Sequence, residues 1–354
     1  MNRARKQDTP WRVIMGLTVL AASLLGVSQS SALRPRGADS PSVYWGAYIE
    51  GTQTYRHLYG GQWGDSPWDV RTLAKFEHGA AKRVAVEHYG QPPPWEQSFD
   101  AATANLVEGR GDIAAIDVST QNMPLRAITA GSYDSKIASW ALAAKAWGHP
   151  FFLLFDEEMN GTWYPYSPGR NGNTAADFVA MWRHVHDIFT VVGATNVTWV
   201  WCPNVDPDHV FTPYSELYPG DAYVDWTGLN GYNWGGREWT SFAKVFGSSY
   251  AALRQLAPTK PIMIGETASA EVGGSKAAWI TRAFSTDLPK NFPRVKAVLW
   301  FNWRIHEKGA WRPWEIESSA TAQRAFAAAV KSGYYAAGGR FANLPLLTKV
   351  QPLR

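Results

Sequence analysis

The stretch "FFLLFDEEMNGTWYPY" at residues 151–166 decides the fold. Five apolar residues run directly into three consecutive acids, Asp156, Glu157 and Glu158, and one Trp and two Tyr follow within eight residues of the last acid. A short apolar run bounded by polar residues is typical of a buried strand. The segment therefore predicts a strand that ends in a cluster of carboxyl groups with aromatic rings around them.

Short strand-like runs of this kind alternate with longer helix-like segments along most of the chain. Eight runs begin at residues 43, 82, 111, 150, 196, 223, 260 and 295, so successive starts lie 27 to 46 residues apart. Each interval fits one helix and two loops. The segments at 135–148 and 174–193 have apolar residues at three- and four-residue spacing, and the second ends on a glycine. Strict alternation indicates parallel strands joined by crossover helices.

Eight strand–helix units over about 260 residues match an α/β fold of the (β/α)8 TIM barrel type. We predict a single domain of this kind at residues 43–335. The alternative is an open doubly wound sheet, which usually carries a glycine-rich phosphate loop after its first strand. The segment "EGTQTYRHLYGGQWG" at residues 50–64 contains neither GxGxxG nor GxxxxGK[ST], which favours the barrel.

The N-terminal residues have the pattern of an export signal. Basic residues precede an apolar run at residues 13–27, and the small residues at 30–32 suit a cleavage site. We predict a signal peptide at residues 1–32, with an uncleaved signal anchor as the alternative, and a linker at 33–42. Because no later segment is long and apolar enough to cross a bilayer, we expect a secreted or cell-surface protein. Residues 336–354 have no clear role and are assigned as a C-terminal tail.

Composition limits the classes of function. The chain of 354 residues is 45% hydrophobic, enough for a sizeable core, and its 19 Trp exceed what packing usually requires, so some rings are expected to face a ligand. The 34 basic and 30 acidic residues are interspersed, and beyond the N-terminal segment no basic stripe suggests nucleic acid. The single Cys202 excludes an internal disulfide. No HExxH or comparable ligand spacing occurs, so we expect neither a metal nor another cofactor.

Acidic residues lie where the predicted strands end. The fourth run ends in Glu158, the seventh contains Glu266, and the second ends in Glu87 and His88. Parallel barrel strands deliver their C-terminal residues to one rim, and the fourth and seventh strands face one another across it. Glu158 and Glu266 can therefore converge. Two carboxyl groups about 5 to 5.5 Å apart are the machinery of a retaining glycosidase, in which one is the nucleophile and the other the acid and then the base.

This chemistry requires the two acids to differ in protonation. Glu158 has to hold its proton, and we expect the apolar neighbours Met159 and Trp163, together with the charge of Glu266, to raise its pKa. Glu266 has to be ionised, and Tyr232 at the end of the sixth run is the candidate hydrogen-bond donor. A single rim glutamate is more often solvated or ion-paired. Two of them that end buried strands favour the catalytic interpretation, because burial without a role costs free energy.

Aromatic residues near the acids suit a sugar ligand, because sugar rings present apolar C–H faces. The candidates are Trp163, Tyr164 and Tyr166 after the fourth run, Trp234 after the sixth, and Trp300 and Trp303 at the eighth. Trp199 and Trp201 lie within the fifth run and are predicted to be core residues. Met159 is predicted to fill the core, and Gly161 to form the sharp turn out of the strand.

These segments resemble glycoside hydrolase family 26, secreted barrel enzymes best known as endo-β-1,4-mannanases, with some β-glucanases and β-xylanases among them. The resemblance spans residues 43–303, and its most specific parts are "EEMNGTWYP", which is similar to the family's HEMNGxW, "WVWCPN", "YPGDAYVDWTGLNGYNW" and "PIMIGETAS". It implies Glu158 as acid/base, Glu266 as nucleophile, Tyr232 as the partner of the nucleophile, and Trp300 as a platform under the cleaved sugar.

The chain departs from the family's mannanases at one position. These usually place His immediately before the acid/base, where it contacts the sugar, whereas this chain has Glu157. A carboxyl group there changes both the hydrogen bonding and the local field. His88 from the second run is either a replacement imidazole or a satisfied core histidine. The eighth run also lacks the Arg expected beside the platform in some mannanases.

The residues and the resemblance together predict a secreted, monomeric, retaining endo-β-glycosidase. Its substrate is expected to be a polysaccharide, β-1,4-mannan or a related β-glycan, that contacts Tyr232, Trp300, Trp163, Trp234, Glu157 and His88. A β-glucanase or an exopolysaccharide-processing glycosidase of the same fold is one alternative. A noncatalytic polysaccharide-binding protein is another, although the presence of both acids argues against it.

Overall fold

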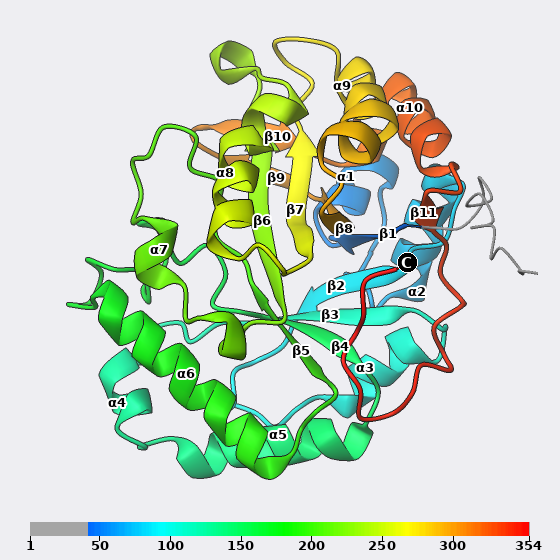
Figure 1. Cartoon of the computed structure of the whole chain (residues 1–354). Helices are drawn as coiled ribbons and strands as arrows, with labels where there is room; N and C mark the ends of the chain where they lie inside the picture. Colours follow the sequence, from blue (N-terminus) through cyan, green and yellow to red (C-terminus); the bar gives the residue numbers. More distant parts are fainter. Residues whose placement is uncertain (1–41, 354) are drawn as a thin grey trace, which may run out of the picture. The chain divides into compact units, whose positions relative to one another are not determined.

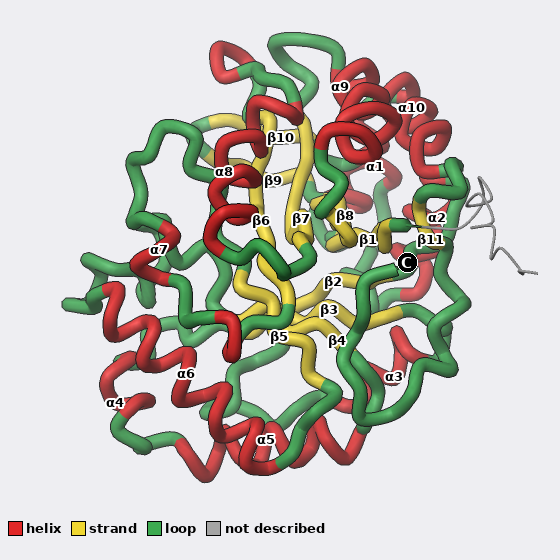
Figure 2. Tube along the Cα trace, viewed as in Figure 1, coloured by secondary structure: helices red, strands yellow, loops and turns green. Residues whose placement is uncertain are grey.

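The computed structural model describes residues 42–353. Within that range eight parallel strands form a closed barrel in chain order, because β8 pairs with β1 as well as with β7. Figure 2 shows these strands in yellow, with helices around them. The strands are β1 (Val43–Ile49), β2 (Val86–Gly90), β3 (Ile113–Val118), β4 (Phe151–Phe155), β5 (Val197–Trp201), β6 (Trp226–Asn233), β7 (Ile262–Ser269) and β8 (Val295–Asn302). Each predicted run overlaps one strand, so the (β/α)8 barrel is confirmed.

Helices occupy the segments between the strands (Figure 1). They are α1 (Thr54–Tyr59), α2 (Val70–Ala80), α3 (Ala101–Glu108), α4 (Leu125–Thr129), α5 (Asp134–Trp147), α6 (Ala175–Val192), α7 (Tyr214–Leu217), η1 (Asp221–Tyr223), η2 (Gly236–Glu238), α8 (Phe242–Leu256), α9 (Lys276–Arg282), η3 (Ala283–Asn291), η4 (Ile316–Ser318) and α10 (Ala320–Val330). The two helices predicted from periodicity are α5 and α6. Thr174 and Asp177 form a capping box at the start of α6, and Gly193 ends it with φ of 73°.

Each strand alternates between two apolar layers. In β3, Ile113 and Ala115 belong to the cluster inside the barrel, whereas Ile116 belongs to the cluster between strands and helices. Successive side chains of a strand point to opposite faces. The inward series of β3 therefore continues at its C-terminal end with Asp117. The same alternation brings Tyr48, His88, Asn204, Asn230, Tyr232 and Phe301 to the C-terminal mouth.

The C-terminal segment covers the opposite mouth of the barrel (Figure 1, red). The short strand β11 (Tyr335–Ala336) pairs with the start of β1. Val350 is 2% exposed and belongs to the inner apolar cluster. Its backbone N donates to Thr198 Oγ1 at 2.8 Å, and its carbonyl accepts from Trp226 Nε1 at 3.2 Å. The segment assigned as a tail at residues 336–354 thus closes the N-terminal end of the barrel.

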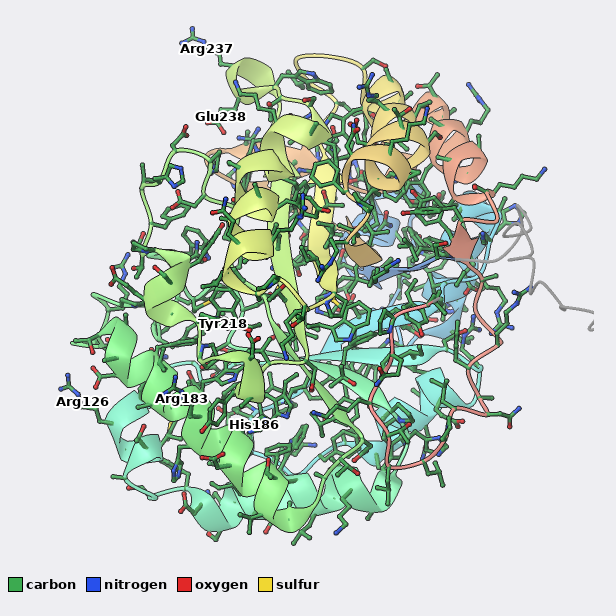
Figure 3. All side chains as sticks on the ribbon, viewed as in Figure 1. Arg126, Arg183, His186, Tyr218, Arg237 and Glu238 are labelled. Carbon is green, nitrogen blue, oxygen red and sulfur yellow. The ribbon has the colours of Figure 1, made fainter. Side chains whose placement is uncertain are left out.

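A hairpin that the sequence did not predict follows β8. Its strands β9 (Arg304–Glu307) and β10 (Ala310–Pro313) are joined by Lys308 and Gly309, both with positive φ, as a two-residue turn requires. The ammonium of Lys308 lies 3.7 Å from Glu238 Oε2, so the hairpin touches the loop after β6. Figure 3 shows the neighbouring Arg237 pointing away from the barrel.

Several predictions concern residues 1–41, including the signal peptide, its anchor alternative and nearly all of the linker, and these lie outside the described residues. In residues 42–353 no helix is long and apolar enough to span a membrane. The same range contains no group of three or more His, Cys, Asp or Glu side chains that could hold a metal ion. Cys202 is a buried free thiol.

Candidate active site

The turn after β4 is held in an unusual backbone conformation. Asp156 and Glu158 have φ of 45° and 55°, a region that residues other than glycine rarely adopt. Such residues cost on the order of 1–3 kcal/mol each and persist only where their surroundings fix them. Here the Asp156 amide donates to Val118 O of β3 at 3.0 Å, and the Glu158 amide donates to Cys202 O at the end of β5 at 2.8 Å. These two bonds fix the direction of the Glu158 side chain.

Glu158 is 8% exposed and accepts a hydrogen bond on each oxygen. Trp163 Nε1 lies 2.7 Å from Oε2, and Asn204 Nδ2 lies 2.8 Å from Oε1. Burial raises the pKa of Glu158, and these two donors oppose the rise. The expectation that Trp163 raises this pKa as an apolar neighbour was wrong, because its N–H points at the carboxyl group. Met159 is fully buried in the outer apolar layer, which confirms it as a core residue.

Gly161 is required by the ring of Trp163. A Cβ atom at position 161 would lie 2.4 Å from Cη2 of that ring, well inside contact distance. The backbone of Gly161 does not have positive φ. Gly161 does close the turn after β4, since its amide donates to Glu158 O at 3.0 Å, and what requires glycine at this position is the close approach of the indole.

Glu266 comes from β7 on the far side of the same mouth. It is 8% exposed; Tyr232 donates its hydroxyl to Oε2, and His88 Nδ1 lies 4.0 Å from Oε1. Burial and then the charge of Glu158 raise the pKa of Glu266, whereas the bond from Tyr232 lowers it. Tyr232 thus donates to Glu266 as predicted, and the charge of Glu158 acts on the same carboxyl group.

Glu157, which directly precedes the predicted acid/base, is also buried. It is 6% exposed, and Asn230 Nδ2 donates to its Oε2 at 2.8 Å. Its carbonyl accepts from Tyr166 OH at 2.7 Å. Burial and then the charge of Glu266 raise its pKa well above the usual range. At neutral pH this position therefore carries a carboxyl group that tends to keep its proton.

His88 lies on the inner face of β2 beside Glu266. It is 2% exposed, and neither ring nitrogen has a hydrogen-bond partner within residues 42–353. Its ring meets Tyr48 edge-on, with centroids 5.7 Å apart. Burial lowers the pKa of His88 to about 4, so the imidazole is neutral at neutral pH. Within residues 42–353 no hydrogen bond satisfies this ring as that of a core histidine, and its role as a replacement imidazole stays a prediction.

The aromatic residues predicted to bind a sugar differ in how far they are exposed. Trp163 is 44% exposed at the mouth. Trp234 is half-buried, and the ammonium of Lys308 lies 3.7 Å from its ring centroid, so a cation covers one of its faces. Tyr164 stacks on Tyr166, with centroids 5.0 Å apart. Trp199 and Trp201 are buried in the outer layer, which confirms them as core residues.

Trp300 does not reach the mouth of the barrel. It is 1% exposed, its indole N donates to Trp314 O at 3.0 Å, and its ring packs against Phe326 of α10. Its prediction as a sugar platform was wrong, because strand alternation directs it toward the helices. The inward residue is its neighbour Phe301, which stacks on Tyr48 at 5.1 Å with an interplanar angle of 16°.

Sequence reasoning missed several residues of the mouth. These are Tyr48, Asp117, Asn204, Asn230 and Phe301. The signal for Asp117 was present, because Ile113 and Ala115 precede it at two-residue spacing on the inner face of β3. Burial and the charge of Glu158 raise the pKa of Asp117 to about 7. The two asparagines could be assigned only once their hydrogen bonds to Glu157 and Glu158 were known.

Comparison with known sequences identifies the family of the chain. The sequence model of Glycosyl hydrolase family 26 matches residues 27–291, more than half of the chain. Endoglucanase H of Acetivibrio thermocellus is 36% identical over 282 residues, which are 77% of this chain and 30% of that protein. Mannan endo-1,4-beta-mannosidase A and B of Caldalkalibacillus mannanilyticus is 34% identical over 83 residues, 22% of this chain and 15% of that protein. The chain thus spans less than a third of either relative.

Solved structures share the fold. A GH26 β-mannanase from Bacteroides ovatus superposes with a TM-score of 0.61 and 17% identity, covering 89% of this chain and 94% of that one. A Cellulomonas fimi endo-β-1,4-mannanase, studied as a double mutant, gives 0.62 and 16%, covering 88% and 76%. At these identities the likeness concerns the fold alone. The extent of the family match confirms the family predicted from the sequence: the chain belongs to glycosyl hydrolase family 26.

Proposed function

We propose that the chain is a retaining endo-β-glycosidase, with Glu158 as acid/base and Glu266 as nucleophile. One observation carries this proposal. Two buried carboxyl groups, one from the turn after β4 and one from β7, lie at the C-terminal end of the barrel, and each is held by its own donors, Trp163 and Asn204 for the first and Tyr232 for the second. Active sites of such barrels lie at this mouth.

The electrostatics of the pair favour one proton shared between the two carboxyl groups. Burial raises the pKa of both carboxyl groups, and the charge of Glu158 raises that of Glu266 further. Two nearby carboxyl groups in a buried site resist ionising together, so the pair tends to hold one proton. Retaining hydrolysis needs that state, with one carboxylate to attack and one carboxylic acid to protonate.

The reaction proceeds in two displacements. In the first, the Glu266 carboxylate attacks the anomeric carbon while Glu158 gives its proton to the leaving oxygen, which departs as an alcohol. In the second, Glu158 takes a proton from water, and the resulting hydroxyl displaces Glu266 from the same carbon. Two inversions restore the original anomeric configuration. Tyr232 stabilises the charge that returns to Glu266 in the second step.

A β-glucan is the substrate we favour. The relative that aligns over 77% of the chain is named an endoglucanase, and Glu157 stands where the family's mannanases usually have His. β-1,4-Mannan is the second candidate, supported by the shorter match to a mannan endo-1,4-β-mannosidase. Epimers at one hydroxyl can be separated strongly by a site that hydrogen-bonds it. We assign that distinction to Glu157, which directly precedes the proposed acid/base in the chain.

Activity on a polysaccharide panel tests the proposal. The full chain is incubated with mixed-linkage β-1,3-1,4-glucan, β-1,4-glucan, β-1,4-mannan and β-1,3-xylan, and reducing ends and viscosity are followed. We expect a rapid fall in viscosity on β-glucan, and proton NMR of the first products should show the β anomer. Glu266→Gln should lower turnover by several orders of magnitude. Glu87→Gln, which changes a buried glutamate of β2 that bonds Ser66 away from the acids, is the matched control.

The outcomes separate the alternatives. Retention of polysaccharide without new reducing ends in the wild type identifies a binding protein. An α anomer as first product contradicts the retaining mechanism. The proposed location outside the cytoplasm is tested separately, by expressing the full chain in a secreting host and sequencing the N-terminus of the exported protein, where cleavage after residue 32 is expected. Light scattering of that material tests the expected monomer.

A further inference from the structure

Asp117 is a carboxyl group at the mouth of the barrel that the proposed reaction does not use. It is the last inward residue of β3 and lies beside Leu154 of β4 in the sheet register. β4 is the strand that leads into Glu157 and Glu158. Asp117 is therefore placed by two rigid strands, and its side chain continues the inner face of the barrel at the end where the acids lie.

The other acids at this end of the barrel each have a donor. Asn230 donates to Glu157, Trp163 donates to Glu158, Tyr232 donates to Glu266, and the Thr120 amide donates to Asp156. Asp117 differs, because within the described chain neither of its side-chain oxygens accepts a hydrogen bond; its Oδ1 is buried without a partner, as is Oδ2 of Asp156, but Asp156 has a donor on its other oxygen. In residues 42–353 it also forms no ion pair with a Lys, Arg or His side chain. Its backbone carbonyl, by contrast, accepts from the Gln91 amide at 2.9 Å.

A buried carboxyl oxygen without a partner is costly to keep, so it indicates a partner that arrives with a ligand. The groups around Asp117 disfavour an anionic ligand. Its pKa is raised by burial and by the charge of Glu158, and Asp117 in turn raises the pKa values of Glu157 and Glu266. The ionisation of these four carboxyl groups is thus linked. A hydroxyl group suits this environment, because it donates to a carboxylate and accepts from a carboxylic acid.

We propose that Asp117 is a specificity-determining residue that binds hydroxyl groups of an uncharged sugar seated over Glu158 and Glu266. This inference rests on the proposed function, and it adds the class of sugar at the point of cleavage. Neutral hexose units fit, whereas uronic acid units are repelled by the surrounding carboxyl groups. The residue acts on substrate affinity and selection, and no proton transfer is assigned to it.

The test compares Asp117→Ala and Asp117→Asn with Asp287→Asn in the full chain. All three remove a buried carboxyl oxygen, but Asp287 lies in η3 and its Oδ1 is already bonded within the fold by Arg282 and Asn291. On the polysaccharide that the wild type cleaves, Asp117→Ala should lower kcat/KM about tenfold or more, chiefly through KM, with Tm unchanged or raised. Asp117→Asn keeps an acceptor and should recover part of the loss. Asp287→Asn should lower Tm and leave KM unchanged.

Calorimetry gives a readout that does not depend on turnover. Oligosaccharides of the same glycan are titrated into Glu266→Gln and into Glu266→Gln/Asp117→Ala, together with versions oxidised at C6 to uronic acids. We expect about tenfold weaker binding in the double variant, and weaker binding of the oxidised ligand than of the neutral one by Glu266→Gln. Asp117 variants within twofold of their parents in both KM and affinity overturn the inference, as does equal binding of the oxidised ligand.

The two proposals fail in distinguishable ways. A folded wild type that binds these oligosaccharides and cleaves none of them contradicts the proposed function, and calorimetry then still decides the role of Asp117. A wild type that cleaves the glycan, with Asp117 variants that do so equally well, contradicts this inference alone.

Discussion

The indole nitrogen of Trp163 lies 2.7 Å from Oε2 of Glu158, so the proposed acid/base receives a hydrogen bond from a ring that is 44% exposed. This bond stabilises the ionised form of the carboxyl group and opposes the effect of burial. A sugar stacked on that ring would lie next to the proton that the reaction transfers. Trp163 thus links substrate binding to the protonation of Glu158.

Trp163→Phe should shift the pH profile toward alkali. The variant keeps an aromatic face and loses the N–H donor, so the carboxylate of Glu158 is less stabilised and its pKa rises. Glu158 then stays protonated to higher pH, and the alkaline limb of the kcat/KM profile should move to higher pH. The measurement is the pH dependence of kcat/KM on the glycan cleaved by the wild type. Trp311→Phe, which changes an exposed ring on β10, is the control and should leave the limb in place.

Gly161→Ala should impair the Glu158 carboxyl group indirectly, by displacing the Trp163 ring that donates to it. The new methyl would fall 2.4 Å from the Trp163 ring and force the indole away from Glu158. We expect kcat/KM to fall about tenfold, in proportion to a lost hydrogen bond to a charged group, and the alkaline limb to move as in Trp163→Phe. Gly247→Ala, in α8 with open space around it, controls for the added methyl. A Gly161→Ala profile identical to the wild type would show that the ring does not govern the acid.

Tyr232→Phe tests the other carboxyl group. Loss of the hydroxyl that donates to Glu266 raises the pKa of this group, so the acidic limb of kcat/KM should move to higher pH. Hydrogen bonds to charged groups contribute roughly 1.5–3 kcal/mol, which corresponds to a 10- to 100-fold loss in kcat/KM. Tyr250→Phe in α8 removes a buried hydroxyl elsewhere and is the control. An unshifted acidic limb would contradict the role of Tyr232.

The strands were predictable because each carries its own signal. Their apolar runs are buried between an inner core and a layer of helices, and in a parallel barrel chain order is also spatial order. From the segment around Phe155 and Glu158, both the strand and the acidic residue that follows it could therefore be predicted. The hairpin β9–β10 was missed because four-residue strands with charged residues have no such pattern.

The aromatic assignments failed for a different reason. Trp300 and Phe301 differ by one residue, and one step along a strand reverses the face to which a side chain points. The alternation that starts at Ala297 and Leu299 would have selected Phe301. The bond from Trp163 to Glu158 could not be predicted, because it depends on a loop conformation that only the folded chain fixes.

Val350→Ala should lower stability and leave catalysis intact. Val350 is buried under the N-terminal mouth of the barrel, on the opposite end from the acids. Removing two methyl groups from a core costs roughly 1–3 kcal/mol. Thermal unfolding should show a lower Tm, with kcat/KM of the folded enzyme unchanged. Leu346→Ala changes an exposed residue of the same segment and should have little effect. A loss of kcat/KM at unchanged Tm would contradict the structural role of the segment.

Covalent trapping of the nucleophile tests the account most directly. An activated 2-deoxy-2-fluoro β-glycoside of the sugar that the enzyme cleaves reacts in the first displacement and is released slowly, so peptide mass spectrometry can locate the bound sugar. The account predicts the label on Glu266, in the peptide that contains "PIMIGETAS", and its loss in Glu266→Gln. A label on Glu157, Glu158 or Asp117 would contradict the assignment of Glu266 as the nucleophile.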